Sequence, residues 1–100
     1  MSIDRILQEA STVLSAASRY SAELSEVSKI EHALCRMRIL ITTVAAHTYS
    51  SFGKDANISA EVDELQHVKN ALLRIAEQRF GNTSHVLNEF QYVPKQMTGS

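Results

Sequence analysis

The first quarter of the chain repeats apolar residues at alternating intervals of three and four. This spacing forms the seam of an amphipathic α-helix that packs lengthwise against other helices. It predicts one helix over residues 3–27, about 37 Å long at 1.5 Å per residue. The seam positions are Ile3, Ile6, Ala10, Val13, Ala17, Tyr20, Leu24 and Val27.

The repeat changes phase at the end of this segment, where two successive steps of three lead through Val27 to Ile30. Ser28 and Glu31 have the spacing of a capping box, which marks a helix start. Two interpretations remain open. A turn at residues 25–29 makes the first two helices antiparallel neighbours, whereas one continuous helix of roughly 48 residues makes a rod that must pair with a second chain. We favour the turn, although no glycine, proline, asparagine or aspartate marks it.

A second helix is predicted over residues 29–50. Residues 39–41 are apolar on several sides, so this stretch is expected to be the most buried part of the protein. Gly53 fits a position that ends the helix in a left-handed conformation. The apolar positions of this helix are Ile30, Leu34, Met37, Ile39, Leu40, Ile41, Val44 and Ala45.

A third helix is predicted over residues 59–80, with Ser59 as its N-cap and Gly81 as its left-handed stop. The three segments predict an all-α fold, an antiparallel three-helix bundle with long helices and a short C-terminal extension. The apolar positions of the third helix are Val62, Leu65, Val68, Leu72, Leu73, Ile75, Ala76 and Phe80.

The extension, residues 82–100, follows a helical bundle of residues 1–81 and is expected to be ordered to about residue 93. Its aromatic residues allow two interpretations. Phe90 and Tyr92 are anchors for a protein partner if the extension is free, because aromatic anchors dominate such interfaces. The alternative is that the extension folds back over an open end of the bundle.

The side of the first helix away from its seam carries serine and alanine where charged residues are usual. Small side chains let another backbone approach closely and leave little charge to desolvate. This serine face is therefore predicted to bind a partner helix or a second copy of the chain, and the alternative is a merely tolerated polar exterior. The serine face consists of Ser11, Ser15, Ser18, Ala22 and Ser25.

Lys29, Arg36 and Arg38 give the second helix a local basic character. In a dimer the basic residues of two chains can form one face, which makes nucleic-acid contact the alternative function. In the other interpretation the arginines pair with Glu31 or with acidic residues of the first helix. No aromatic residue interleaves with them for base stacking.

Composition narrows the classes of function. Ten Lys and Arg stand against eleven Asp and Glu, a net charge of −1, whereas a duplex-binding module is usually strongly basic. One cysteine cannot form an intrachain disulfide, which fits a reducing compartment. No apolar run reaches the roughly 18 residues of a membrane span. We expect a cytoplasmic protein with no membrane partner.

Candidate chemistry is sparse. His32 and Cys35 have a spacing that can share a metal, but a site needs further ligands, and Cys35 is better explained as a small buried hydrophobic residue. No nucleophile–base pattern or glycine-rich phosphate loop occurs. We therefore expect no catalytic residue, no metal and no cofactor.

These observations predict a non-enzymatic protein-binding module. It would be a small adapter, chaperone or inhibitor that acts through a helical surface on a larger protein partner. A homodimer is also expected, because long helices with a wide apolar girdle leave more apolar surface than one chain covers easily.

Overall fold

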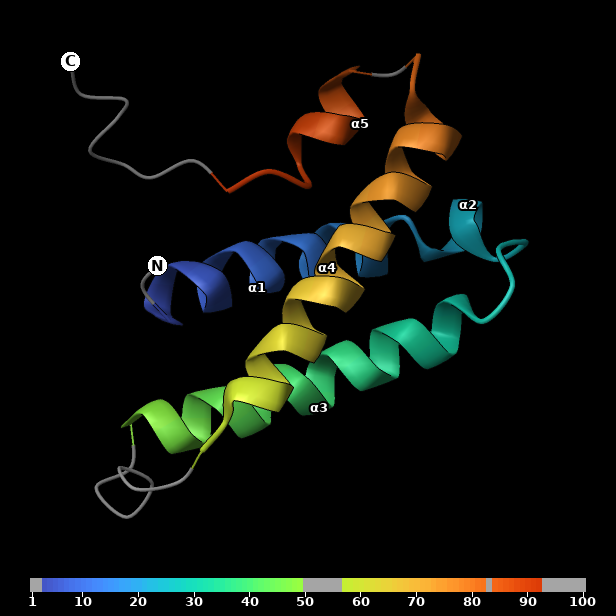
Figure 1. Ribbon diagram of the computed structural model, residues 1–100. Coiled ribbons are helices and arrows are strands. Elements are labelled where there is room, and N and C mark those ends of the chain that lie inside the picture. The colour runs from blue at the N-terminus through green and yellow to red at the C-terminus, as the bar shows by residue number, and fades with distance from the viewer. Residues whose placement is uncertain (1–2, 50–56, 83, 93–100) are drawn as a thin grey trace, which may run out of the picture.

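The computed structural model describes residues 3–49, 57–82 and 84–92 (Figure 1). Gly53 and position 93, on which two of the predictions fall, lie outside these residues. The described parts of the chain form helices and contain no strand. The helices are α1 (Ile3–Arg19), α2 (Ser21–Leu24), α3 (Ile30–Tyr49), α4 (Ser59–Phe80) and α5 (Ser84–Asn88).

The three long helices pack against one another and enclose the core. α1 and α3 run in opposite directions, and α4 crosses this pair and contacts both members (Figure 1). Met37, Leu65 and Leu72 lie at the centre and are at most 2% exposed. The predicted all-α three-helix bundle is confirmed.

The seam of the first helix is confirmed, but the helix itself is shorter than predicted. α1 ends at Arg19, because Tyr20 has φ −101° and ψ 26° and leaves the helical path. The chain then makes the single helical turn of α2. The buried seam residues are Ile6, Ala10, Val13, Ala17 and Leu24, and those packed partly buried against the core are Ile3, Tyr20 and Val27.

The chain turns at residues 25–29, so the continuous rod is wrong and the antiparallel arrangement of the first two long helices is confirmed. Short backbone hydrogen bonds build the turn: Val27 donates to the Leu24 carbonyl at 2.9 Å, and Ile30 donates to the Val27 carbonyl at 3.2 Å. Successive tight bonds of this kind reverse the chain without a glycine or proline.

The start of α3 differs from the predicted capping box by one residue. The Lys29 carbonyl accepts the helical bond from the Ala33 N–H at 3.0 Å, so Lys29 holds the cap position. The predicted box of Ser28 and Glu31 is therefore wrong, because the helix begins at Ile30.

Lys29 also supplies the turn's unusual backbone angle, a φ of 64°. A β-carbon makes this left-handed region unfavourable by about 1 kcal/mol or more. Lys29→Gly is expected to raise the free energy of unfolding by about 0.5–1 kcal/mol, measured by urea denaturation. Lys29→Ala is the matched control, since it removes the charge and keeps the β-carbon. Equal stabilisation by alanine would contradict the backbone explanation.

α3 buries one face only, which corrects two expectations. Leu40 is 1% exposed, but Ile39 is 49% exposed, so residues 39–41 are not uniformly buried. Consecutive helical residues point about 100° apart and cannot all face the same neighbours. Cys35, expected to be buried, is exposed for the same reason.

α4 has the predicted extent, but both of its ends differ from the prediction. The Asn57 side-chain oxygen accepts a hydrogen bond from the Ser59 N–H at 3.0 Å, so Ser59 is the first helical residue and not the cap. Gly81 has φ −56° and is right-handed. The absence of a side chain still matters there, because a β-carbon would stand 2.8 Å from the Glu77 carbonyl oxygen.

The C-terminal extension folds back onto the bundle through α5. The Phe90 ring lies with its centroid 6.5 Å from that of Tyr20 and 6.4 Å from that of Phe80. Glu89 accepts hydrogen bonds from the Tyr20 hydroxyl and the Arg19 guanidinium. The hydrogen bond from Tyr20 lowers the pKa of Glu89 and raises the pKa of Tyr20. The extension therefore closes the end of the bundle where α1 stops.

Candidate functional site

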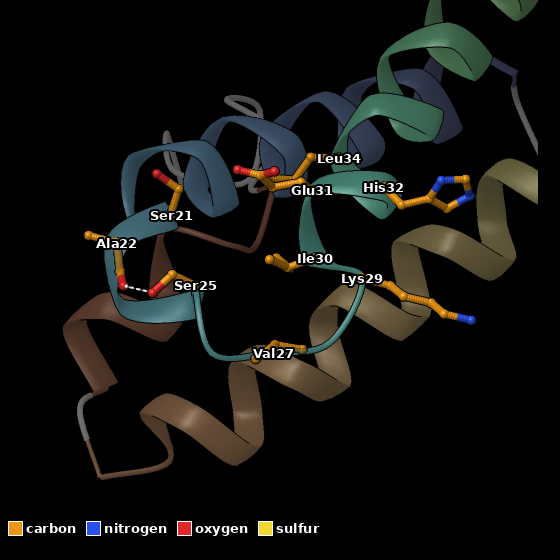
Figure 2. A pocket seen from close by; sticks show the side chains of 9 residues that line it. All are labelled: Ser21, Ala22, Ser25, Val27, Lys29, Ile30, Glu31, His32 and Leu34. Atoms are coloured by element: carbon orange, nitrogen blue, oxygen red, sulfur yellow. Dashed lines mark hydrogen bonds between the residues drawn. The ribbon is translucent and has the colours of Figure 1, made fainter.

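A hollow of about 380 Å³ opens where α2, the turn and the start of α3 meet (Figure 2). We call it the junction hollow. It exists because α1 stops at Arg19 and the chain takes a wide path before α3. Its lining residues are Ser21, Ala22, Ser25, Val27, Lys29, Ile30, Glu31, His32 and Leu34.

The junction hollow combines an apolar interior with a polar rim. The Ile30 side chain points into it, whereas Lys29 and His32 extend away from its centre (Figure 2). Ile30 and Leu34 are each 5% exposed, so the apolar wall is continuous with the core. The Ser25 hydroxyl donates to the Ala22 carbonyl at 2.8 Å. This arrangement suits the contact of an apolar group.

The serine face is divided by the break at Tyr20. Ala22 and Ser25 line the junction hollow. Ser11 and Ser15 line a second hollow of about 250 Å³ beside Arg19 and Glu89. The remaining member, Ser18, points toward α3. The five residues therefore do not form one continuous stripe, because α2 leaves the direction of α1.

Ser18 has its own neighbour on α3. The Arg38 guanidinium lies 3.5 Å from the Ser18 hydroxyl oxygen. Arg38 is otherwise exposed. This contact places Ser18 at the border between the two antiparallel helices and separates it from both hollows.

The two aromatic anchors differ in their exposure. Phe90 is 2% exposed and belongs to the core. Tyr92 is partly buried, and the Arg5 guanidinium lies 5.5 Å above the centre of its ring. Tyr92 therefore keeps part of its ring at the surface, whereas Phe90 does not.

The basic residues of α3 do not gather in one patch. Arg36 makes two hydrogen bonds of 2.7 Å to the Glu64 carboxylate of α4, which raise the pKa of Arg36 and lower that of Glu64. The pairing expected for this arginine is present, but its predicted acidic partners were wrong. Lys29 stands at the turn, and Arg38 lies on the α1 side of α3. Residues two apart on a helix point in nearly opposite directions.

A partly buried ion pair joins α1 and α4, and the sequence pattern does not predict it. Lys69 is 9% exposed, and its Nζ donates to Glu9 at 3.0 Å and to Gln66 at 3.2 Å. The pair borders a hollow of about 390 Å³ that Phe90 and other residues also line. The sequence does indicate that Lys69 is buried. It lies four residues after Leu65, in heptad register on the apolar side of the helix.

No group of three or more metal-binding side chains occurs among the residues that the structure describes. None of the helices described here is long and apolar enough to cross a membrane. Comparison of the chain with known protein families, with curated proteins and with solved structures gives no match.

Proposed function

We propose that this protein is a non-enzymatic binding module that acts on a larger protein partner through the junction hollow. The observation that carries the proposal is the apolar wall of Val27, Ile30 and Leu34 within a rim of charged and polar groups. An apolar centre surrounded by a polar rim is the usual anatomy of a protein–protein interface.

The hollow's size suits an anchor side chain of the partner. At about 380 Å³ it has room for one large apolar side chain, such as leucine, methionine or phenylalanine, and part of its backbone. Lys29 and Glu31 stand at its border with opposite charges and can orient a polar segment beside that anchor. Adapter, chaperone and inhibitor roles all use such a contact.

Nucleic-acid binding is the alternative, and the charges on α3 favour it less. Arg36 is already held by Glu64, and Lys29 and Arg38 lie apart from it. Phosphate recognition depends on several cations that act together. The same experiment distinguishes the two functions.

Ala22→Glu is expected to abolish capture of a stoichiometric protein partner from a lysate of the native source, because it places a charge at the border of the hollow that the partner must cover. Ala60→Glu is the matched control, since Ala60 is exposed in the first turn of α4 and tolerates a negative charge. Both variants should keep the wild-type melting temperature. A partner that survives nuclease and binds both variants equally contradicts the junction hollow as the site. Partners that are lost after nuclease treatment support the alternative.

A further inference from the structure

A single residue interrupts what would otherwise be one helix from α1 through α2. The Tyr20 N–H still donates to the Ala16 carbonyl at 3.1 Å, and the Tyr20 carbonyl still accepts from the Leu24 N–H at 3.1 Å. Only the ψ of 26° at Tyr20 ends α1 and turns α2 away from its line (Figure 1). No glycine or proline, the usual cause of a sharp kink, lies between residues 20 and 27. The local sequence therefore allows a continuous helix, and contacts from elsewhere hold the bend.

These contacts come from residues 84–92, which we call the latch, and from the end of α4. The Phe90 ring of the latch has its centroid 6.5 Å from that of Tyr20, and Phe80 packs against both rings. Glu89 accepts hydrogen bonds from the Tyr20 hydroxyl and the Arg19 guanidinium. The latch thus holds the two residues at which α1 stops.

The latch and α2 are the least self-supporting parts of the described fold. α5 has five residues and α2 has four. Helices this short are not stable alone in water, so tertiary contacts maintain both of them. Segments with few such contacts open at a lower cost than the whole fold does. The latch and α2 can therefore rearrange while α1, α3 and α4 stay packed.

We propose that the latch is a conformational switch for the bend at Tyr20. When the latch is docked, α2 turns aside and contributes Ala22 and Ser25 to the junction hollow. When the latch is released, residues 20–24 join α1 as one helix, and the hollow loses the wall that α2 supplies. The consequence for partner binding rests on the proposed function of the hollow, but the conformational change does not.

The apolar seam supports the second conformation. It continues past the bend through Leu24 and Val27 in the spacing of α1, so a straight helix keeps these residues on its apolar side. A second contact opposes straightening, because Arg79 donates to the Glu23 carbonyl at 3.0 Å and pairs with Glu26. The Glu26 side chain is 77% exposed, and exposed ion pairs stabilise little. The latch, rather than Arg79, therefore determines the bend.

The test measures distances between two spin labels on the full chain by double electron–electron resonance. One label is attached to the native Cys35, which is exposed on α3. The second is attached to α2 through Glu23→Cys, to α1 through Gln8→Cys or to the latch through Asn88→Cys, all at exposed positions. The three pairs report separately on the bend, the bundle and the latch.

Three lysine substitutions at successive positions of the latch form a matched series. Glu89→Lys is expected to release the latch, because it places a like charge beside Arg19. Phe90→Lys is expected to release it more completely, since an unpaired lysine is too costly to bury in the core. Gln91→Lys is the control, because Gln91 is exposed.

The wild type and the control should each give one distance for every pair. In the two releasing variants, the latch pair and the α2 pair should both gain a second, separate distance, with equal populations in the two pairs. The α1 pair should keep its wild-type distance. Equal populations are expected because release of the latch and straightening at Tyr20 are one transition.

Three results would overturn the proposal. The first is a released latch with an unchanged α2 distance, which would mean that the bend does not depend on the latch. The second is a latch that stays docked in every folded variant of the series. The third is a change in the α1 pair as well, which would mean that the whole bundle rearranges. No readout involves a partner, so failure here is distinct from failure of the junction hollow as a binding site.

Discussion

Phe90→Ala is expected to lower the free energy of unfolding by about 3–5 kcal/mol, the usual loss for a phenylalanine truncated in a core. Phe90 is 2% exposed, and its ring packs with Tyr20 and Phe80. The substitution removes the Phe90 ring from this aromatic cluster and leaves a cavity at the end of the bundle. Urea denaturation followed by far-UV circular dichroism measures the change.

Two companion variants identify the cause. Phe90→Leu keeps much of the buried apolar volume and should cost less than half as much as alanine. Tyr92→Ala removes an aromatic ring from the same segment, but this ring is only partly buried beneath Arg5, so the loss should stay below about 1 kcal/mol. A loss from Phe90→Ala as small as that expected for Tyr92→Ala would mean that Phe90 is not part of the core.

The long helices could be predicted because their apolar periodicity is long and regular. Ile6, Val13 and Leu24 follow the heptad repeat and are buried. Any other rotation of such a helix would expose its apolar residues to water. The apolar pattern therefore determines which side of the helix faces the core. The apolar positions of α4 follow the same rule, which explains why its range was predicted correctly.

The ends and bends of the helices could not be predicted, because their causes are tertiary. Tyr20 leaves the helical path where its ring packs against Phe80, with the centroids 5.6 Å apart. Arg79 of α4 then holds the chain after the bend through a 3.0 Å hydrogen bond to the Glu23 carbonyl. Neither contact leaves a signature in local sequence. The left-handed conformation of Lys29 could not be predicted from the sequence either, since lysine does not favour that conformation.

For the same reason, the sequence predicts only some of the residues that line the junction hollow. The small side chains of Ala22 and Ser25 predict a contact surface, and both residues line the junction hollow. Ser11 and Ser15 share one stripe with them only if the helix is straight. The bend at Tyr20 turns the two groups apart. The apolar wall of the hollow comes from Ile30 and Leu34, whose periodicity marked them only as core.

Glu9→Gln is expected to lower the free energy of unfolding at neutral pH by about 1–2 kcal/mol, because it leaves Lys69 charged and largely buried without a carboxylate. The full 3–5 kcal/mol of a broken buried ion pair does not apply, since the Glu9 side chain is 27% exposed. Glutamine keeps the shape and a hydrogen-bond acceptor, so the change isolates the charge.

Lys69→Met is the matched control. It replaces the buried cation with an apolar chain of similar length, and Glu9 keeps its 3.0 Å ion pair with Arg5. The loss should therefore stay within about 1 kcal/mol, since volume is preserved and no charge is left buried alone. A larger loss from Lys69→Met than from Glu9→Gln would contradict this account.

The pH dependence of the Glu9→Gln effect provides the second readout. Burial raises the pKa of Glu9, but hydrogen bonds from Lys69 and Arg5 outweigh it and hold the pKa below its ordinary value of 4.5. The folded protein thus binds this proton less readily than the unfolded chain does. The stabilisation by ionised Glu9 is complete above pH 4.5 and is lost as the pH falls through the lowered pKa. The wild type and Glu9→Gln should therefore differ in urea denaturation at neutral pH and converge in acid, where the protonated carboxyl resembles the amide. A difference that persisted unchanged in acid would mean that packing, and not the charge on Glu9, stabilises the contact between α1 and α4.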